Sequence, residues 1–166
     1  MTVSSVSAAD HTLMTPTEMR VAEQLVTGQS NDQAAEALGM QPGTFRRHLT
    51  RIGWKLQATS RPARAHAVLS SGQIDPPVTS LERPSLCEDD LLLLKAVAEH
   101  SENQDIARTA RIHRTEVRAK LAGLVKKTGA DNAAHLVGLA HAWGILGDTS
   151  NSQPAPTATA TAGPAR

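Results

Sequence analysis

Six lysine and arginine side chains, and no carboxylate, lie within residues 44–64, in the stretch TFRRHLTRIGWKLQATSRPAR. A guanidinium group can donate two parallel hydrogen bonds to a phosphate, or to the O6 and N7 atoms of guanine. The wider window of residues 37–74 also contains no Asp or Glu, although the formal net charge of the whole chain is only +1. A second window, residues 106–130, has seven basic residues and one acid, Glu116. Basic residues concentrated in this way favour a polyanionic partner over an ordinary solvated surface.

The basic residues of the first window fall on a predicted amphipathic helix at about residues 44–56. Its apolar residues recur at helical spacing and form one stripe that we expect to face the core, namely Phe45, Leu49, Ile52 and Leu56. The side chains that must then point away from the core are Arg46, Arg47, Thr50, Arg51 and Trp54. The helix therefore combines one packing face with one cationic face.

We expect the whole chain to be all-α. Hydrophobic residues make up 40% of the sequence but aromatic residues only 2%, and a core rich in Ala and Leu favours helices over strands. Start signals such as Thr15-Pro16 with Glu18, together with stops at glycines, predict helices at residues 16–27, 30–38, 44–56, 62–71, 88–99, 103–109, 114–128 and 132–143. A short helix, a tight turn and a longer basic helix form a helix-turn-helix, whose second helix can enter the major groove of DNA.

The second part of the chain repeats the first. A shift of 72 residues, without a gap, aligns basic, apolar and glycine positions. The aligned identical pairs include Asn31 with Asn103, Ala35 with Ala107, Arg46 with Arg118, Leu49 with Leu121, Lys55 with Lys127, Ala58 with Ala130 and Gly72 with Gly144. Few residues are identical, so the evidence for a repeat is the ungapped register of apolar and basic positions together.

The predicted fold is all-α, with two tandem four-helix helix-turn-helix domains joined by a proline-containing linker. We place the first domain at residues 13–74, the linker with its three prolines at residues 75–85, and the second domain at residues 86–147. Residues 1–12 are expected to be a flexible N-terminus, and the low-complexity residues 148–166 a disordered tail.

The first domain resembles the LuxR/GerE-type helix-turn-helix module, the DNA-binding end of many bacterial two-component and quorum-sensing regulators. The positions that carry the resemblance are Thr15-Pro16, Glu18, Gly28, Ser30-Asn31, Ala35-Glu36, Leu38-Gly39, Thr44-Phe45, His48-Leu49, Ile52, Lys55-Leu56, Ser60-Arg61 and Gly72-Gln73-Ile74. The resemblance implies that bases are read by Arg46, Arg47 and Thr50. It also implies that phosphates are touched, or the helix supported, by Thr44, His48, Arg51, Lys55, Ser60 and Arg61. The chain departs from the family at Gly53, where a large residue is usual, and at Trp54, where a polar or basic residue is common.

The second domain looks like a diverged copy of the same module. Its basic candidates for DNA contact are Arg114, Arg118, Lys120 and Lys127. Three positions that would touch DNA in the first copy are replaced in the second, by Glu116, Ala119 and Ala122. We therefore expect the second copy either to bind DNA with less specificity or to have become a pairing module.

These observations predict a sequence-specific transcriptional regulator that binds double-stranded DNA and reads the major groove with the helix of residues 44–56. No sensor domain is expected, because only about a dozen residues precede the first module. The alternative is a protein-interaction or dimerisation protein, whose second copy binds another regulator, RNA polymerase or itself. The expected partners are thus double-stranded DNA, and a second copy of the chain or a pseudo-dimer of its two modules.

Other classes of protein find little support. The single cysteine, Cys87, excludes an internal disulfide framework and a cysteine metal site, and the scattered histidines lack metal-ligand spacing, so we expect no metal and no cofactor. No Gly-rich phosphate loop, nucleophile elbow or pair of carboxylates indicates an enzyme. The N-terminus lacks a secretory signal and the longest apolar run, residues 91–94, is too short to cross a membrane, so a cytoplasmic protein without a membrane partner is expected.

Overall fold

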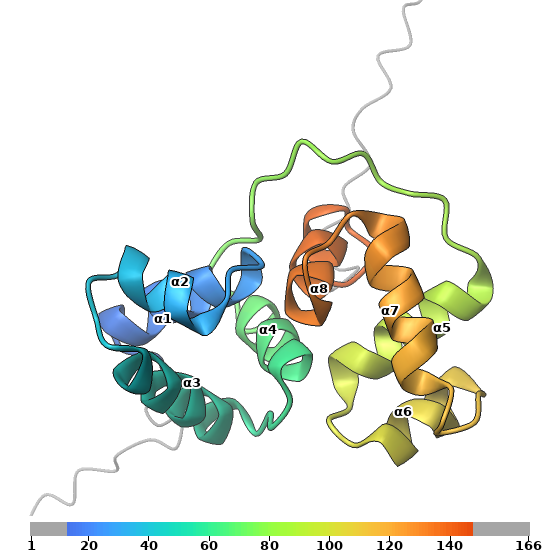
Figure 1. The fold of residues 1–166 in the computed structure, drawn as a ribbon, viewed down its shortest axis with the longest axis horizontal. Helices are drawn as coiled ribbons and strands as arrows, with labels where there is room; N and C mark the ends of the chain where they lie inside the picture. The colour runs from blue at the N-terminus through green and yellow to red at the C-terminus, as the bar shows by residue number, and fades with distance from the viewer. Residues whose placement is uncertain (1–12, 148–166) are drawn as a thin grey trace, which may run out of the picture.

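The computed structural model describes residues 13–147, and in this part of the chain it confirms the expected all-α fold. The helices are α1 (Pro16–Val26), α2 (Asn31–Ala37), α3 (Pro42–Leu56), α4 (Arg61–Ser70), α5 (Glu88–Glu99), α6 (Asn103–Ala110), α7 (Val117–Thr128) and α8 (Ala133–Ala142) (Figure 1). None of these described helices is long and apolar enough to cross a bilayer. The predicted flexible N-terminus and disordered tail, residues 1–12 and 148–166, lie outside the described residues.

The starts of α1, α2 and α4 are set by local hydrogen bonds, of which the sequence predicted the caps at Thr15 and Ser30. Thr15 caps α1, since its hydroxyl accepts the Glu18 N–H while the Glu18 carboxylate accepts the Thr15 N–H at 2.9 Å. Ser30 and Gln33 form the same reciprocal pair at α2. Ser60 caps α4 through the Ala63 N–H. Each cap satisfies N–H groups that the first turn of a helix leaves without a partner.

Two predicted helix starts are wrong, because α3 begins at Pro42 and not at Thr44, and α7 begins at Val117 and not at Arg114. In α3 the first helical residue is Pro42, whose ring already holds a helical φ. The second half has Arg114 at the corresponding position, and the local polar groups there close a turn instead. The Glu116 carboxylate accepts the His113 N–H at 2.9 Å, and the Glu116 N–H donates to the His113 carbonyl. Helix α7 is therefore shorter than α3 at its N-terminal end.

The first half (residues 13–74) and the second half (residues 86–147) share backbone features at positions 72 residues apart. The left-handed backbone conformation occurs at Gly39 and Arg111, at Gln57 and Gly129, and at Gly72 and Gly144. Matching turn hydrogen bonds run from Met40 to the Ala35 carbonyl and from Ile112 to the Ala107 carbonyl. Two different residues, Gln57 and Arg111, thus adopt the conformation that glycine adopts at the corresponding position, although it is unfavourable for a residue with a side chain.

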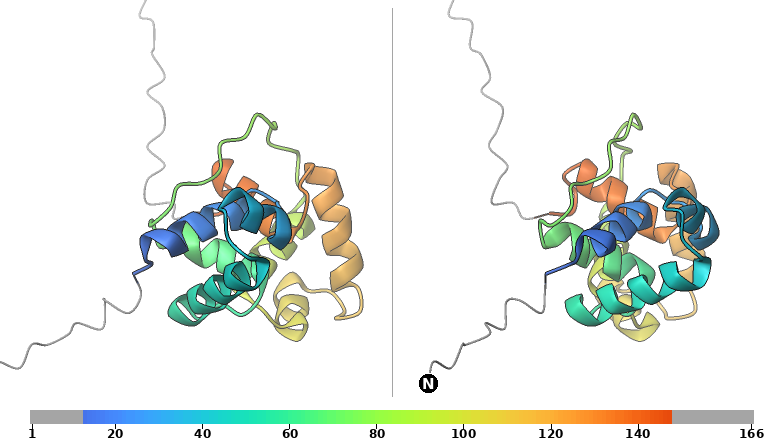
Figure 2. Two further views of the ribbon diagram at one scale, coloured as in Figure 1. Left: turned by 60° about the vertical axis from the view of Figure 1, so that its left-hand side comes forward. Right: turned by 90° about the vertical axis from the view of Figure 1, so that its left-hand side faces the viewer.

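The two halves pack directly against each other through their last helices. Helix α4 lies against α8, α4 also contacts α5, and α8 also contacts α1 (Figures 1 and 2). If α5–α8 are matched with α1–α4, the α4–α5 and α8–α1 contacts are the same contact with the halves exchanged. Such reciprocity is the property of an interface between two subunits related by a twofold axis. A single cluster of buried apolar residues runs through both halves.

Hydrogen bonds at the edges of this interface are also reciprocal, because each half donates one to the turn after the first helix of the other half. The side chain of Asn132, at the start of α8, donates to the Gly28 carbonyl after α1 at 2.9 Å. The N–H of Ser60, at the start of α4, donates to the hydroxyl of Ser101 after α5 at 3.0 Å. The linker is held as well, because the indole N–H of Trp143 donates to the Leu81 carbonyl at 2.9 Å. This hydrogen bond ties the middle of the linker to the residue that follows α8.

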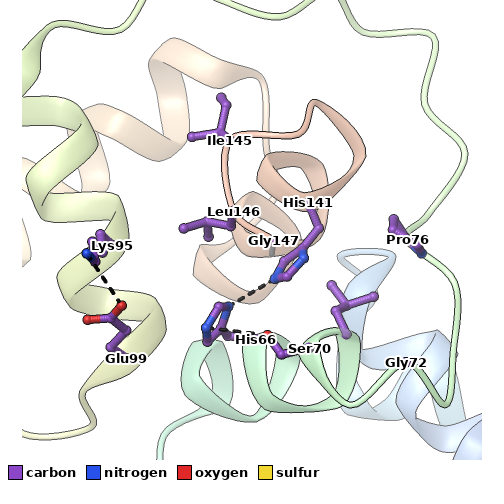
Figure 3. Close-up of a pocket in the computed structure, with 11 residues that line it drawn as sticks. His66, Ser70, Gly72, Pro76, Lys95, Glu99, His141, Ile145, Leu146 and Gly147 are labelled. Carbon is purple, nitrogen blue, oxygen red and sulfur yellow. Dashed lines mark hydrogen bonds and ion pairs between the residues drawn. The ribbon is translucent and has the colours of Figure 1, made fainter. Parts of the chain in front are cut away.

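Two histidines meet across the interface beside an open cavity of about 780 Å³ (Figure 3). His66 Nδ1 of α4 lies 3.0 Å from His141 Nε2 of α8. Burial lowers the pKa of His66, which the Glu99 carboxylate partly offsets. Burial and the neighbouring His66 lower the pKa of His141 to about 4. The interface therefore favours the neutral form of both imidazoles.

We predict opposite effects from adding one methyl group to two helical glycines. A Cβ on Gly138 of α8 would lie 2.7 Å from the Val26 carbonyl oxygen of α1, whereas a Cβ on Gly123 of α7 would meet nothing within 4 Å. Gly138→Ala should lower the free energy of unfolding by about 1–3 kcal/mol because the halves must separate. Gly123→Ala should raise it by up to about 1 kcal/mol through helix propensity. Urea unfolding of both variants measures this, and equal stabilisation by both would mean that the halves do not pack this closely.

The histidine pair predicts a loss of stability between neutral and mildly acidic pH. A folded-state pKa below the ordinary value means that the unfolded chain binds more protons, so the stabilisation is complete above about pH 6.5 and is lost toward about pH 4. Urea unfolding at pH 7, 6 and 5 should show the wild type losing stability relative to His141→Gln, which cannot titrate. His113→Gln, at an exposed histidine, is the control and should follow the wild type. If the free energy of unfolding changed with pH by the same amount in the wild type and in His141→Gln, the prediction would be contradicted.

Candidate nucleic-acid interface

The apolar stripe of α3 fixes which way the helix faces. Phe45 and Ile52 are 0% exposed and Leu49 is 4% exposed, and they pack in the core of the first half. Helix α3 lies against α1, α2 and α4. The buried side of α3 thus agrees with the predicted stripe, and its rotation about its own axis is set by packing.

The opposite side of α3 is an exposed cationic surface. Its exposed side chains include those that the stripe predicts, Arg46, Arg47, Thr50, Arg51 and Trp54, and also Thr44. Within residues 13–147, none of these arginines forms an ion pair with an acid. The Thr50 hydroxyl donates to the Arg46 carbonyl at 3.1 Å, which leaves its oxygen available as an acceptor. Trp54 is 77% exposed, at the C-terminal end of the same surface.

His48 lies at the border between the exposed and buried sides of α3. Its side chain is half-buried, and its Nδ1 atom is buried without a hydrogen-bond partner among the described residues. A buried ring nitrogen without a partner costs free energy unless another molecule supplies one. The histidine is thus less accessible to a ligand than the arginines beside it.

Lys55, by contrast, is engaged within the protein. Its ammonium lies 2.6 Å from the Glu18 carboxylate and 3.0 Å from the Leu13 carbonyl oxygen. Glu18 is only 2% exposed. Burial by itself would raise the pKa of Glu18, but the hydrogen bonds from Lys55 and the Thr15 N–H hold it below the usual value. The ion pair ties the C-terminal part of α3 to the capped start of α1.

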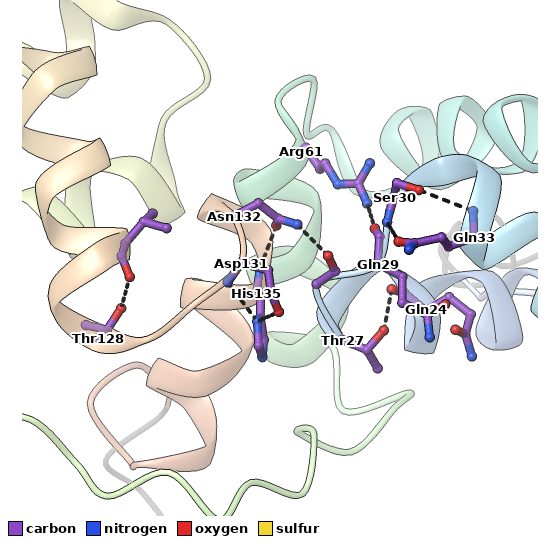
Figure 4. Close-up of polar contacts among 12 residues, drawn as sticks. Gln24, Thr27, Gln29, Ser30, Gln33, Arg61, Thr128, Asp131, Asn132 and His135 are labelled. Carbon is purple, nitrogen blue, oxygen red and sulfur yellow. Dashed lines mark hydrogen bonds and ion pairs between the residues drawn. The ribbon is translucent and has the colours of Figure 1, made fainter.

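Ser60 and Arg61 also hold the protein together, at the start of α4. One terminal nitrogen of the half-buried Arg61 donates to the Gln29 carbonyl (Figure 4), and the other donates to the Asn31 side chain. These contacts join α4 to the turn between α1 and α2. Ser60 caps α4 and donates to Ser101 of the second half. Both residues hold the start of α4 in place, and α3 packs against α4.

Sequence reasoning missed Arg64, which reaches from α4 toward α3. Its Nε–H donates to the Ala58 carbonyl at 3.1 Å, and its side chain is half-buried. The space that it fills is left by Gly53, since a Cβ there would lie 2.6 Å from Arg64 Nε. The departure from the family at Gly53 was visible in the sequence. Its partner was not, because α4 carries several residues that could have faced it.

The second half also exposes basic side chains, in and before α7. Arg114 lies exposed in the turn before α7, and Arg118 and Lys120 are exposed on α7, beside Ala119 and Ala122. Lys127 lies 2.5 Å from the Asp90 carboxylate. This hydrogen bond, against the effect of burial, holds the pKa of Asp90 below the usual value. The pair corresponds to Lys55 and Glu18 in the first half, 72 positions earlier.

The comparison with known families bears on the first half. The family model described as bacterial regulatory proteins, luxR family (GerE), matches residues 12–68, which include α1, α2, α3 and most of α4. Neither the search of curated proteins nor the search of solved structures found a match. The matched segment does not include residues 86–147. Residues 12–68 therefore contain a LuxR/GerE-type helix-turn-helix domain, and this supports a DNA-binding regulator.

Proposed function

We propose that the protein is a sequence-specific transcriptional regulator that inserts α3 into the major groove of double-stranded DNA. The observation that supports this most strongly is the exposed row of unpaired arginines on α3, within a LuxR/GerE-type domain. In this proposal Arg46, Arg47 and Thr50 face base edges, since an arginine fork matches guanine O6 and N7. Groove binding would bring the three unpaired guanidinium groups of α3 next to acceptors of opposite charge.

Phosphates are the proposed partners of the residues around this readout group. Thr44 lies in the first turn of α3, where Gln41 provides no side-chain cap. Backbone N–H groups at a helix start favour a phosphate, and the Thr44 hydroxyl can add one hydrogen bond. Arg51 lies one turn beyond Arg47 on the exposed side, where it can reach the backbone of the duplex. His48 is instead proposed to support the helix, because its Nδ1 atom is buried and cannot reach a phosphate.

We propose that residues 86–147 are a diverged second helix-turn-helix copy, and that the two copies form a pseudo-dimer within one chain. The packing of α4 against α8 and the reciprocal contacts α4–α5 and α8–α1 support this arrangement. Arg114, Arg118 and Lys120 would then bind phosphates without reading bases. All the helices of residues 13–147 belong to these two copies, so we propose no sensor in that part of the chain. The site of action is the cytoplasm, where bacterial DNA lies.

One observation favours a second candidate function for the second half. Its exposed α7 surface has Ala119, Ala122 and Gly123 near the places of readout residues, so a protein partner such as another regulator or RNA polymerase could pack closely there. The apolar side of α8 is less available for such a partner, because α4 already covers it. This candidate assigns DNA binding to the first half and protein binding to the second.

We predict that Arg47→Ala reduces sequence preference more than general affinity. The wild type first selects its duplex from a random library, and fluorescence anisotropy then gives Kd for that duplex and for a random one. Loss of one base contact, worth about 1–3 kcal/mol, should weaken binding of the selected duplex roughly 5- to 150-fold and of the random duplex much less. Arg83→Ala, in the exposed linker, is the control and should change neither.

The possible results separate the candidate functions. Equal losses on both duplexes would remove Arg47 from base readout. A wild type that binds no duplex at low salt would favour the protein-interaction function. A pseudo-dimer should bind the selected duplex as one chain per duplex at saturation, as measured by sedimentation, whereas two chains per duplex would contradict it.

We predict that Lys55 contributes mainly to stability. Lys55→Met would leave the buried Glu18 carboxylate without its cation, which should lower the free energy of unfolding by roughly 2 kcal/mol. Lys127→Met should have a smaller effect, because its partner Asp90 has a side chain 23% exposed compared with 3% for Glu18. The double variant Glu18→Gln/Lys55→Met should recover part of the loss. Unchanged urea unfolding of Lys55→Met would show that the ion pair is not stabilising.

A further inference from the structure

A small pocket lies beside the exposed surface of α3, between α3 and the start of α4. It has a volume of about 340 Å³ and is lined by Asn31, Arg46, Leu49, Thr50, Arg61 and Arg64. Three of these six residues are arginines, and none is acidic. Arg46 and Thr50 belong to the exposed surface of α3, whereas Arg61 and Arg64 reach the pocket from α4. The pocket is thus continuous with the surface that we propose to face DNA.

The positive charge of this pocket is not neutralised by the protein. Arg61 donates only to neutral acceptors, the Asn31 side chain and the Gln29 carbonyl, and its Nε atom is buried without a partner among the described residues. Arg64 donates from Nε to the Ala58 carbonyl. Burial lowers the pKa of both arginines, and the charge of Arg64 lowers that of Arg61 further. Like charges brought together out of water are unfavourable unless an anion joins them.

Gly53 admits Arg64 to this position. A Cβ at Gly53 would lie 2.6 Å from Arg64 Nε and 2.7 Å from the Ala58 carbonyl oxygen, so a larger residue would push the guanidinium out. Glycine in the middle of a helix costs about 1 kcal/mol relative to alanine. Gly53 thus lowers the stability of α3, and it makes room for a guanidinium between α3 and α4.

The second half lacks two of the three arginines that line this pocket. Arg46 and Asn31 correspond to Arg118 and Asn103, but the positions 72 residues after Arg61 and Arg64 are Ala133 and Leu136. Leu136 is fully buried. Of the last helices of the two halves, only α4 thus places arginines at these positions. The fold itself therefore does not require a cationic group there.

We propose that Arg64, together with Arg61, binds one phosphate group of the DNA backbone in this pocket, beside the groove that α3 reads. A phosphate offers several acceptor oxygens, which match the donors that lack acceptors here. Because Arg46 lies both in the pocket and on the reading surface, a phosphate held there sets the position of α3 along the duplex. The inference rests on the proposed function and adds Arg64 to the residues that the family resemblance suggested.

The phosphate site can be tested by removing the charge of one DNA phosphate at a time. In the selected duplex, one phosphate at a time is replaced by an uncharged methylphosphonate, and Kd is measured for the wild type, Arg64→Met and the control Arg83→Met. At one backbone position the replacement should weaken the wild type several-fold and Arg64→Met clearly less, while Arg83→Met follows the wild type. The salt dependence of log K should also fall by about one unit of slope in Arg64→Met, as expected for one lost phosphate contact.

Three further measurements keep the test independent of folding and of the source of the phosphate. Urea unfolding shows whether Arg64→Met folds, and Arg64→Lys, which keeps the charge, should restore part of the salt slope. Titration with inorganic phosphate, observed through the arginine NMR signals, tests a free ligand. Binding of inorganic phosphate to the wild type without any position-specific effect on DNA would overturn the assignment to the DNA backbone.

The failure of this inference can be told apart from the failure of the proposed function. If the wild type binds no duplex, the proposed function fails. If the wild type binds DNA and Arg64→Met shows the same salt slope and the same loss at every methylphosphonate, only the pocket is disproved. In that case Arg64 serves to pack α3 against α4.

Discussion

The rotation of α3 about its own axis is the constraint on which the surface depends. Phe45, Leu49 and Ile52 are buried almost completely, so the helix cannot turn without exposing them to water. With that side fixed, the arginines between them must face outward. The side chains proposed to bind DNA are thus positioned by buried ones that do not face it, and a mutation in the apolar stripe would displace the whole cationic surface at once.

The basic residues divide into those that hold the fold and those that remain available. Lys55 and Lys127 each pair with a carboxylate at the start of the first helix of their own half. The arginines of α3 have no such partner among residues 13–147. Since a carboxylate close to the surface would compete with a polyanion, the acid-free stretch of sequence is needed around the arginines and not around the lysines. Positive charge alone therefore does not identify a binding residue.

Much of the fold could be predicted because it depends on local signals. The Thr15 and Ser30 caps and the spacing of Phe45, Leu49 and Ile52 involve residues close in sequence. The predicted start of α7 was wrong because polar side chains around Glu116 close a turn where the first half has a proline. The Lys55 ion pair, the place of Arg64 and the packing of α4 on α8 join distant residues, and neither spacing nor composition specifies which distant surfaces meet.

The differences between the halves suggest how one chain can combine two roles. In a homodimer both subunits must carry the same residues, so a change that improves packing in one also alters DNA contact in the other. A chain whose halves pack reciprocally is free of that constraint. The second half has Leu136 in its last helix where the first half has Arg64, and Ala119 where the first has Arg47. Burial of Leu136 strengthens the core of one half, while the charge of Arg64 stays in the half whose surface is proposed to read the duplex.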